Sequence, residues 1–166
     1  VVMVTGAGGS IGAELCRQIL RSFPSILIML DNSEHALYQI EKELKSLTKS
    51  GSTELIALLG SVRDLNRMET IYKTFSVQTV YHAAAYKHVD MLERQPSVAV
   101  QNNVLATHSL AELAKEKKVD HFVLISTDKA VEPSSIMGAT KRLAEQFIEG
   151  HAMGSVRTKY MSVRFG

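Results

Sequence analysis

Four polar residues in a row, Ser126-Thr127-Asp128-Lys129, come directly after the apolar run of residues 122–125. The run predicts a strand, so the hydroxyl, carboxylate and amine groups stand where that strand ends. Groups of these three kinds can donate and accept protons during catalysis. The pattern predicts proton-transfer chemistry at the end of this strand.

A second pattern lies near the start of the chain. Gly6, Gly9 and Gly12 stand three residues apart between a predicted strand and a predicted helix. The first glycine allows a sharp turn, the second lets the backbone approach a pyrophosphate, and the third lets the helix pack on the strand. The helix that begins at Ser10 and Ile11 offers free N–H groups and its positive dipole end to phosphates. These features predict a dinucleotide-binding loop.

Asp31 ends the second predicted strand, 19 residues after Gly12. A carboxylate there can accept hydrogen bonds from the ribose hydroxyls of an adenosine and repels a 2′-phosphate, so it favours NAD over NADP. An alternative interpretation makes Asp31 a cap for the next helix and the glycines a simple turn. The strand–loop–helix context favours the dinucleotide.

Short β-rich runs alternate with longer helical patterns. Strands are predicted at residues 1–5, 25–31, 53–59, 78–83, 119–126 and 159–164. Helices are predicted at residues 10–22, 33–49, 64–75, 97–117 and 135–151. This alternation predicts an α/β fold, a doubly wound parallel sheet with helices on both faces. Asp64 is a predicted cap of the third helix, whereas Pro133 and Gly150 mark the limits of the last one.

The composition argues against several classes of protein. A net charge of +2 over 166 residues, without a run rich in Lys and Arg, argues against nucleic-acid binding. The single cysteine cannot form an internal disulfide, and the longest aliphatic stretch, residues 26–30, is too short to span a bilayer. The six histidines show no metal-ligand spacing, so no metal is expected. The chain begins within a predicted strand and stops where another has just ended, which predicts that residues 1–166 are one domain of a longer protein.

Several segments together carry a resemblance to a known family. They are the glycine loop, His-Ala-Ala-Ala at 82–85, Asn103, the run 126–129 and Met-Gly-Ala-Thr-Lys at 137–141. With these segments the chain resembles an extended short-chain dehydrogenase/reductase. Within that superfamily it is similar to the CapD-like polysaccharide-biosynthesis group, the UDP-N-acetylglucosamine 4,6-dehydratases. The similarity covers essentially the whole chain, and the Thr-Asp-Lys run with the segment 137–141 is its most specific part.

The resemblance implies a Rossmann-type sheet in the order 3-2-1-4-5-6, truncated before a smaller C-terminal substrate domain. It implies NAD as the cofactor, a UDP-sugar as the substrate, and pairing of two copies through the helices at 97–117 and 135–151. It also implies a cytoplasmic domain, with membrane helices upstream in the full-length protein. The residues that it places at the cofactor are Gly6, Gly9, Ser10, Ile11, Gly12, Asp31, Ser61, Val62, Ala83, Ala84, Asn103 and Lys141. Lys87 is placed near the sugar.

Two residues depart from the superfamily pattern. Ser61 stands where many relatives have an aspartate that contacts the adenine. Met137 stands where most of the superfamily has a catalytic tyrosine, and a thioether can neither donate nor accept a proton at a useful pKa. The resemblance associates this replacement with dehydratases that retain the configuration at C5, so Met137 predicts a retaining enzyme.

In the implied reaction, hydride leaves C4 of the sugar for NAD⁺, a proton leaves C5, water leaves from C6, and the hydride returns to C6. Lys129 is the candidate base at C5, which requires its pKa to fall from about 10.4 to roughly 7–8 through burial and nearby positive charge. Asp128 is the candidate acid at C6, and Thr127 the candidate hydrogen-bond partner of the C4 oxygen. Lys141 is expected to hold the nicotinamide ribose. The C4 hydroxyl loses its proton to Asp128 or to a water held by Thr127.

Two other functions and one plainer interpretation compete with this one. A nucleotide-sugar 4-epimerase also oxidises C4, but it relies on the tyrosine that this chain lacks and needs no Asp-Lys pair. A non-catalytic domain that binds NAD for regulation or assembly is consistent with Met137. Residues 127–129 could also be only a polar exit from the strand.

Overall fold

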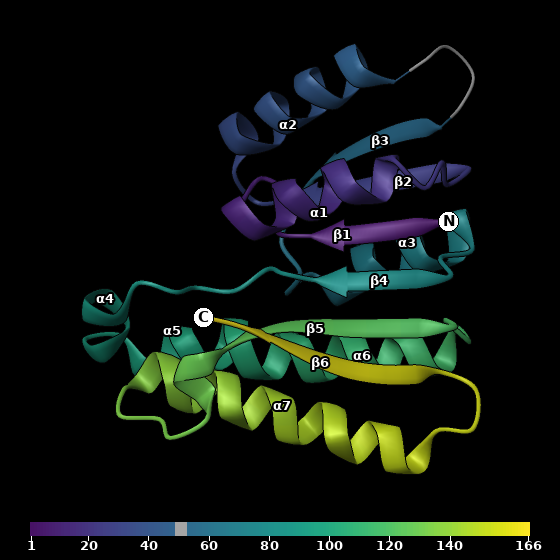
Figure 1. The fold of residues 1–166 in the computed structure, drawn as a ribbon. Helices are drawn as coiled ribbons and strands as arrows, with labels where there is room; N and C mark the ends of the chain where they lie inside the picture. Colours follow the sequence, from purple (N-terminus) through teal and green to yellow (C-terminus); the bar gives the residue numbers. More distant parts are fainter. Residues whose placement is uncertain (49–52) are drawn as a thin grey trace.

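The computed structural model describes residues 1–48 and 53–166, in which six strands alternate with helices (Figure 1). The strands are β1 (Val2–Thr5), β2 (Ile26–Asp31), β3 (Glu54–Leu59), β4 (Thr79–His82), β5 (His121–Thr127) and β6 (Lys159–Phe165). The α-helices are α1 (Ser10–Leu20), α2 (Glu34–Leu47), α3 (Leu65–Phe75), α4 (Val89–Glu93), α5 (Pro96–Ala99), α6 (Ala106–Glu116) and α7 (Ile136–Gly154). The π-helix η1 (Val100–Leu105) and the 3-10 helix η2 (Asp128–Ala130) complete the elements. All predicted strands and helices are present, although residue 49, the last of the predicted helix 33–49, lies outside the described residues.

The six strands form one parallel sheet in the order β3-β2-β1-β4-β5-β6. Val4 of β1, for example, lies opposite Met29 of β2 on one side and Tyr81 of β4 on the other. Parallel neighbours require a crossover connection, and the helices provide it. The predicted Rossmann-type order is therefore confirmed.

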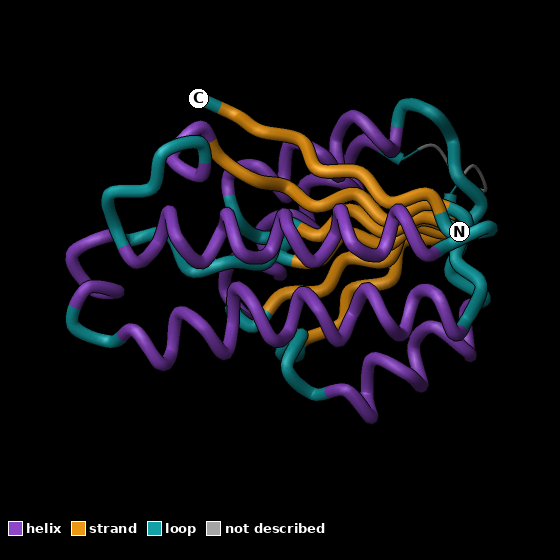
Figure 2. Tube along the Cα trace, turned by 90° about the horizontal axis from the view of Figure 1, so that it is seen from below, coloured by secondary structure: helices purple, strands orange, loops and turns teal. Residues whose placement is uncertain are grey.

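Alternate side chains of the central strands enter two separate cores. On β2, Ile28 and Leu30 belong to the core that contains α3, α6 and α7, whereas Leu27 and Met29 belong to the core that contains α1 and α2. Helices therefore cover both faces of the sheet, and Figure 2 shows them on both sides of the twisted strand layer. Burial on both faces explains the nearly continuous apolar strand sequences. Among the described residues, no helix is long and apolar enough to cross a membrane.

Side-chain caps mark the starts of three long helices. Ser33 accepts the N–H of Ala36 at the start of α2, Asp64 caps α3 as predicted, and Ser135 caps α7. Gly9 precedes α1 and has no side chain with which to cap it. The first N–H groups of α1 are therefore left for another partner.

Some local features differ from the predicted elements. The predicted helix 97–117 is a continuous helical segment in which η1 joins α5 to α6. A short helix, α4, was not predicted and lies in the connection after β4. Gly150 lies inside α7, which continues to Gly154, and an added Cβ at Gly150 meets no atom within 4 Å. That glycine does not end the helix.

The same substitution should have opposite effects at two glycines. A Cβ at Gly12 would lie 1.9 Å from the carbonyl oxygen of Gly6, so Gly12→Ala forces α1 away from the loop after β1 and should lower the free energy of unfolding by about 1–3 kcal/mol. Gly150→Ala adds a methyl group in open space on a helix and should raise this free energy by roughly 0.5–1 kcal/mol. Urea unfolding of both variants measures the difference. Equal effects would contradict the close packing at Gly12.

Candidate active site

A cleft of about 240 Å³ opens at the carboxyl ends of the strands, where β1 separates β2 from β4. The strand order reverses at this point, and ligands of open parallel sheets bind there. The loops after four strands and one side chain of η1 form its walls. The lining residues are Gly6, Gly8, Gly9, Leu30, Asp31, Asn32, Ser33, Ala36, Gly60, Ser61, Val62, Ala83, Ala84, Ala85, Tyr86 and Asn102.

The shape of the cleft depends on the glycine at position 6. Gly6 has a φ of +69°, in the left-handed region that glycine adopts without strain. An added Cβ there would lie 2.6 Å from the backbone nitrogen of Ala84, so the loops after β1 and β4 touch at this residue. Beyond Gly9, the uncapped N–H groups and the positive dipole end of α1 suit a phosphate group. The loop therefore has the sharp turn and the helix start that were predicted from the glycine spacing, and the approach of a pyrophosphate to its backbone stays a prediction.

Asp31 joins the loops after β1 and β2. One carboxylate oxygen accepts the N–H of Gly8 at 2.8 Å, and the other accepts the N–H of Ser33, also at 2.8 Å. The side chain that caps α2 is Ser33, so Asp31 is not the helix cap of the alternative interpretation. Each of its oxygens keeps a second lone pair, with which it can accept a hydrogen bond from a ribose hydroxyl.

Most of the predicted cofactor residues meet at the cleft. Those that line it are Gly6, Gly9, Asp31, Ser61, Val62, Ala83 and Ala84. Ser10 and Ile11 are exposed at the start of α1, whereas Gly12 packs behind the loop. The nine lining residues that the sequence analysis missed are Gly8, Leu30, Asn32, Ser33, Ala36, Gly60, Ala85, Tyr86 and Asn102. Five of these nine, Gly8, Asn32, Gly60, Ala85 and Tyr86, are in the predicted loops, so including every residue of those loops would have found them.

Asn103 is absent from the lining of the cleft, and its amide is fully hydrogen-bonded within the protein. Its oxygen accepts the N–H of Tyr86 at 2.8 Å and that of the Asn102 side chain at 3.2 Å. Its nitrogen donates to the Tyr86 carbonyl at 2.9 Å and to the Thr140 hydroxyl at 3.2 Å. Asn103 therefore anchors the loop after β4 to α7, and its contact with the cofactor stays a prediction. Asn102, one residue earlier in the π-helix η1, lines the cleft instead.

A second buried network holds the end of β4. The hydroxyl of Thr107 donates its proton to the Asn103 carbonyl at 2.8 Å, so the Nε2–H of His82 must donate to that hydroxyl at 2.9 Å. The Nδ1 atom of His82 then accepts the hydroxyl proton of Thr5 at 2.6 Å. Burial lowers the pKa of His82 to about 3, which keeps the ring neutral. The network ties β1 and β4 to α6 directly below the cleft.

Thr127, Asp128 and Lys129 lie at the end of β5, as predicted, where η2 begins. The Thr127 hydroxyl donates to Oδ1 of Asp128 at 3.0 Å and accepts the N–H of Lys129 at 3.4 Å. The Nζ atom of Lys129 lies 4.0 Å from the same Oδ1 atom. The hydroxyl and the carboxylate are hydrogen-bonded, and the amine forms a long ion pair with the carboxylate.

The expected burial of Lys129 is wrong for this part of the protein. Its side chain is 62% exposed and that of Asp128 is 60% exposed. Both residues follow the end of a strand, where the described residues place no element over them. The role of Lys129 as a base therefore stays a prediction.

Met137 lies in a small apolar cluster with Leu92 of α4 and Ala99 of α5. The helix α4 also holds the start of α7, because the Glu93 carboxylate accepts the N–H of Ile136 at 2.6 Å. A thioether fits this apolar environment, where a phenol hydroxyl would need a polar partner. The structure therefore gives Met137 a packing role in the first turn of α7.

Lys141 is buried one helical turn after Met137. Its ammonium group donates to the carbonyl oxygen of Ile125 on β5 at 2.6 Å. Burial lowers the pKa of Lys141 to about 8, an effect that Glu145 opposes. Lys141 is absent from the lining of the cleft, so its contact with the nicotinamide ribose stays a prediction.

The remaining predicted residues lie at the rim. Lys87 is exposed in the loop between β4 and α4, directly after Tyr86, which lines the cleft. Ser61 lines the cleft on the opposite side and accepts the N–H of Arg63 through its hydroxyl at 3.2 Å. The positions allow Lys87 to meet a ligand that extends past the cleft and Ser61 to meet an adenine.

The low pKa of Lys141 predicts a specific pH dependence of stability. Between pH 8 and 10.5 the unfolded chain binds more protons at this residue than the folded chain, so the free energy of unfolding rises with pH across that window. When the pH is raised from below 8 to above 10.5, the free energy of unfolding of the wild type should increase by about 3 kcal/mol more than that of Lys141→Met. Chemical denaturation at several pH values measures it. Lys42→Met, at an exposed lysine, serves as the control and should leave the pH dependence unchanged. If the difference in unfolding free energy between wild type and Lys141→Met does not change with pH, the burial of Lys141 is contradicted.

Three comparisons place the chain among known proteins. The family described as polysaccharide biosynthesis protein matches residues 2–166. The chain is 45% identical over 165 residues to the capsular polysaccharide biosynthesis protein CapD of Staphylococcus aureus, which covers 99% of this chain and 27% of that protein. It is 27% identical over 168 residues to a UDP-N-acetylglucosamine 4,6-dehydratase (inverting) of Campylobacter jejuni, with 99% of this chain and 48% of that protein covered. The chain thus spans less than half the length of both relatives.

The crystal structure of Pen from Bacillus thuringiensis has the same fold, with a TM-score of 0.89 and 29% sequence identity over 99% of this chain and 50% of that chain. This shared fold agrees with the strand order, and the residues that match the family, 2–166, include the glycine loop. The chain belongs to the polysaccharide biosynthesis family, the CapD-like group of the extended short-chain dehydrogenases/reductases.

Proposed function

We propose that the full-length protein is an NAD-dependent nucleotide-sugar 4,6-dehydratase that converts UDP-N-acetylglucosamine to UDP-4-keto-6-deoxy-N-acetylglucosamine for surface glycan biosynthesis. The observation that carries the proposal is the hydrogen-bonded group of Thr127, Asp128 and Lys129 at the end of β5. The strand β5 lies next to β4, whose loop forms one wall of the cleft. The proposed acid, the proposed base and the cleft for the dinucleotide therefore share one edge of the sheet, which supports the proposal.

The residues of the cleft fit NAD. The glycine loop leaves room for a pyrophosphate at the uncapped start of α1. Asp31 carries two lone pairs for ribose hydroxyls, and its negative charge disfavours the 2′-phosphate of NADP. NAD, when bound, supplies the hydride acceptor and donor of the reaction. The protein supplies the groups that move protons.

Each of the three polar residues has one task in the proposed mechanism. Lys129, as the neutral amine, takes the proton from C5 of the 4-keto sugar and returns it to C5 when hydride reaches C6. Asp128, as the acid, donates a proton to the leaving C6 hydroxyl, and Thr127 hydrogen-bonds the C4 oxygen. Oδ1 of Asp128 lies 4.0 Å from Nζ of Lys129, so in this proposal bound substrate draws the two groups closer before the pair carries a single proton, with the amine neutral and the carboxyl protonated.

Lys141 and Lys87 have supporting roles in this proposal. Lys141 holds the end of β5 through the Ile125 carbonyl, two residues before Thr127, and its ammonium is the group that we assign to the nicotinamide ribose. Lys87 is the exposed cation that we assign to the UDP-sugar. Retention of the configuration at C5 is part of the same proposal, because Met137 stands in place of the tyrosine on α7, the helix that we assign to the side of the reacting sugar.

Two alternatives make different predictions for the fate of the C4 hydrogen. A 4-epimerase returns the hydride to C4 without loss of water. A non-catalytic NAD-binding module leaves the sugar unchanged. The acid–base pair favours dehydration over both, since an epimerase has no elimination to catalyse.

The decisive experiment follows deuterium through the reaction. The full-length protein is incubated with NAD and UDP-N-acetylglucosamine that carries deuterium at C4, and the product is examined by mass spectrometry and NMR. Loss of one water with deuterium at C6 is expected. Return of the label to C4, or recovery of unchanged sugar, would overturn the proposal.

The acid and the base should each be essential to this reaction. Asp128→Asn and Lys129→Met should lower kcat by about 100-fold or more, which is the usual contribution of a positioned proton-transfer group. Asp120 lies directly before the first residue of β5, at the end away from Asp128 and Lys129. Asp120→Asn is therefore the matched control and should keep kcat near the wild-type value. Wild-type kcat in both site variants would show that the pair has no chemical role.

Met137 should contribute packing and no proton transfer. Met137→Leu preserves volume in the cluster with Leu92 and Ala99, so kcat should stay within about threefold of wild type. Met137→Tyr places a bulkier, polar ring in the same cluster and should lower the free energy of unfolding by about 1–3 kcal/mol. Steady-state kinetics and urea unfolding test both variants. A large gain in kcat for Met137→Tyr would instead show a vacant tyrosine role.

A further inference from the structure

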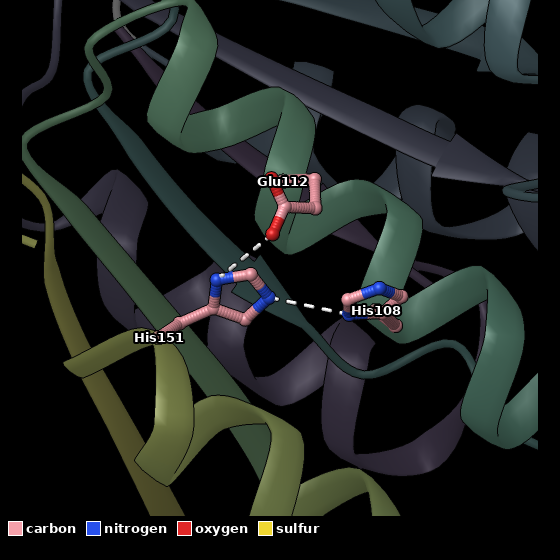
Figure 3. A group of neighbouring side chains, drawn as sticks. All are labelled: His108, Glu112 and His151. Atoms are coloured by element: carbon pink, nitrogen blue, oxygen red, sulfur yellow. Dashed lines mark hydrogen bonds and ion pairs between the residues drawn. The ribbon is translucent and has the colours of Figure 1, made fainter. Parts of the chain in front are cut away.

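A second group of reactive side chains lies outside the cleft, between α6 and α7. His108 and Glu112 stand one turn apart on α6, and His151 comes from the last part of α7 (Figure 3). None of the three lines the cofactor cleft. Neither the proposed reaction nor the family motifs use them.

The distances within this group match those of metal ligands. The Nε2 atom of His151 lies 3.3 Å from the Nδ1 atom of His108. Two nitrogen ligands at about 2.0–2.1 Å from a tetrahedral Zn²⁺ ion lie about 3.3 Å apart. One ligand atom from each of the three residues lies within 4.8 Å of the other two. A single ion can therefore reach all three with small side-chain movements.

We propose that His108, Glu112 and His151 form a Zn²⁺-binding site that joins α6 to α7. His108 Nδ1 and His151 Nε2 supply the two nitrogen ligands. Glu112 supplies the carboxylate, and water completes the coordination on the open side. Two imidazoles and one carboxylate are ligands typical of Zn²⁺ rather than of Mg²⁺ or Ca²⁺, which prefer oxygen atoms throughout.

Aromatic packing fixes both imidazole rings in place. The ring of His108 lies 4.6 Å from that of Phe147, and the ring of His151 stacks on Tyr160 at 5.2 Å. His151 is also buried. The two imidazole rings are therefore held in position before the ion arrives.

The contacts within the group are loose in the absence of an ion. The two imidazole nitrogens at 3.3 Å make a long hydrogen bond, and Glu112 Oε1 lies 3.4 Å from the Nδ1 atom of His151. The Glu112 side chain is 46% exposed and can turn. In its present position it fixes the tautomer that leaves Nε2 free for the metal, and after a turn it can bind the metal directly.

The spacing along the chain explains why this site was not predicted. His108 and Glu112 form an i, i+4 pair on one helix face, which alone is weak evidence. The third residue follows 43 positions after His108. Only the packing of α7 on α6 brings it within reach.

Zinc titration of the full-length protein tests the proposal. Protein freed of metal with a chelator is titrated with ZnCl₂ by isothermal calorimetry, and thermal melting is recorded with and without zinc. Wild type should show one saturable zinc site. The zinc affinity of this site should fall about tenfold or more in His108→Gln and by a similar factor in Glu112→Gln. The melting temperature should rise with zinc in the wild type and not in His108→Gln.

The partly exposed His108 and Glu112 are the residues to change, because the buried His151 also packs against Tyr160. Circular dichroism should show unchanged helix content in both variants. His35→Gln, at an exposed histidine on α2, is the matched control and should bind zinc as the wild type does. The proposal is overturned if wild type shows no saturable site or if His108→Gln binds zinc with wild-type affinity.

Discussion

The contact between Gly6 and Ala84 is the constraint on which the site depends. A Cβ at Gly6 would lie 2.6 Å from the backbone of Ala84, so two loops from neighbouring strands can meet only where this side chain is missing. Their meeting point forms the floor of the cleft at the position where the strand order reverses. Gly12 repeats the same constraint one turn into α1, where the helix packs against the Gly6 carbonyl. The dinucleotide cleft therefore arises from backbone-to-backbone packing.

Buried polar side chains hold the irregular segments that surround this floor. Asn103 uses both N–H groups of its amide on Tyr86 and Thr140, and His82 lies between two threonine hydroxyls. The ammonium of Lys141 donates a hydrogen bond to the carbonyl of Ile125 on β5. Each of these groups would be costly to bury without a partner, so each partner fixes a loop in one conformation.

The two halves of the site differ in how complete they are. The cofactor side is formed by packed loops, with Asp31 bonded to two backbone N–H groups. The reacting side presents Asp128 and Lys129 to solvent. In the proposed reaction, bound substrate would exclude water from this half, which is the condition under which an acid–base pair works best.

The sequence by itself determined the strands, the glycine loop and the position of the Thr127–Lys129 group, because burial on both faces, glycine spacing and strand ends are local features. The strand order was implied only by the resemblance to the family. The tertiary structure decided which polar groups remain available. It used Asn103 internally and placed Asn102 at the cleft, since the π-helix η1 sets which residue points there. It also brought His151 to His108 across two helices. Such pairings depend on packing between distant segments, which local patterns do not encode.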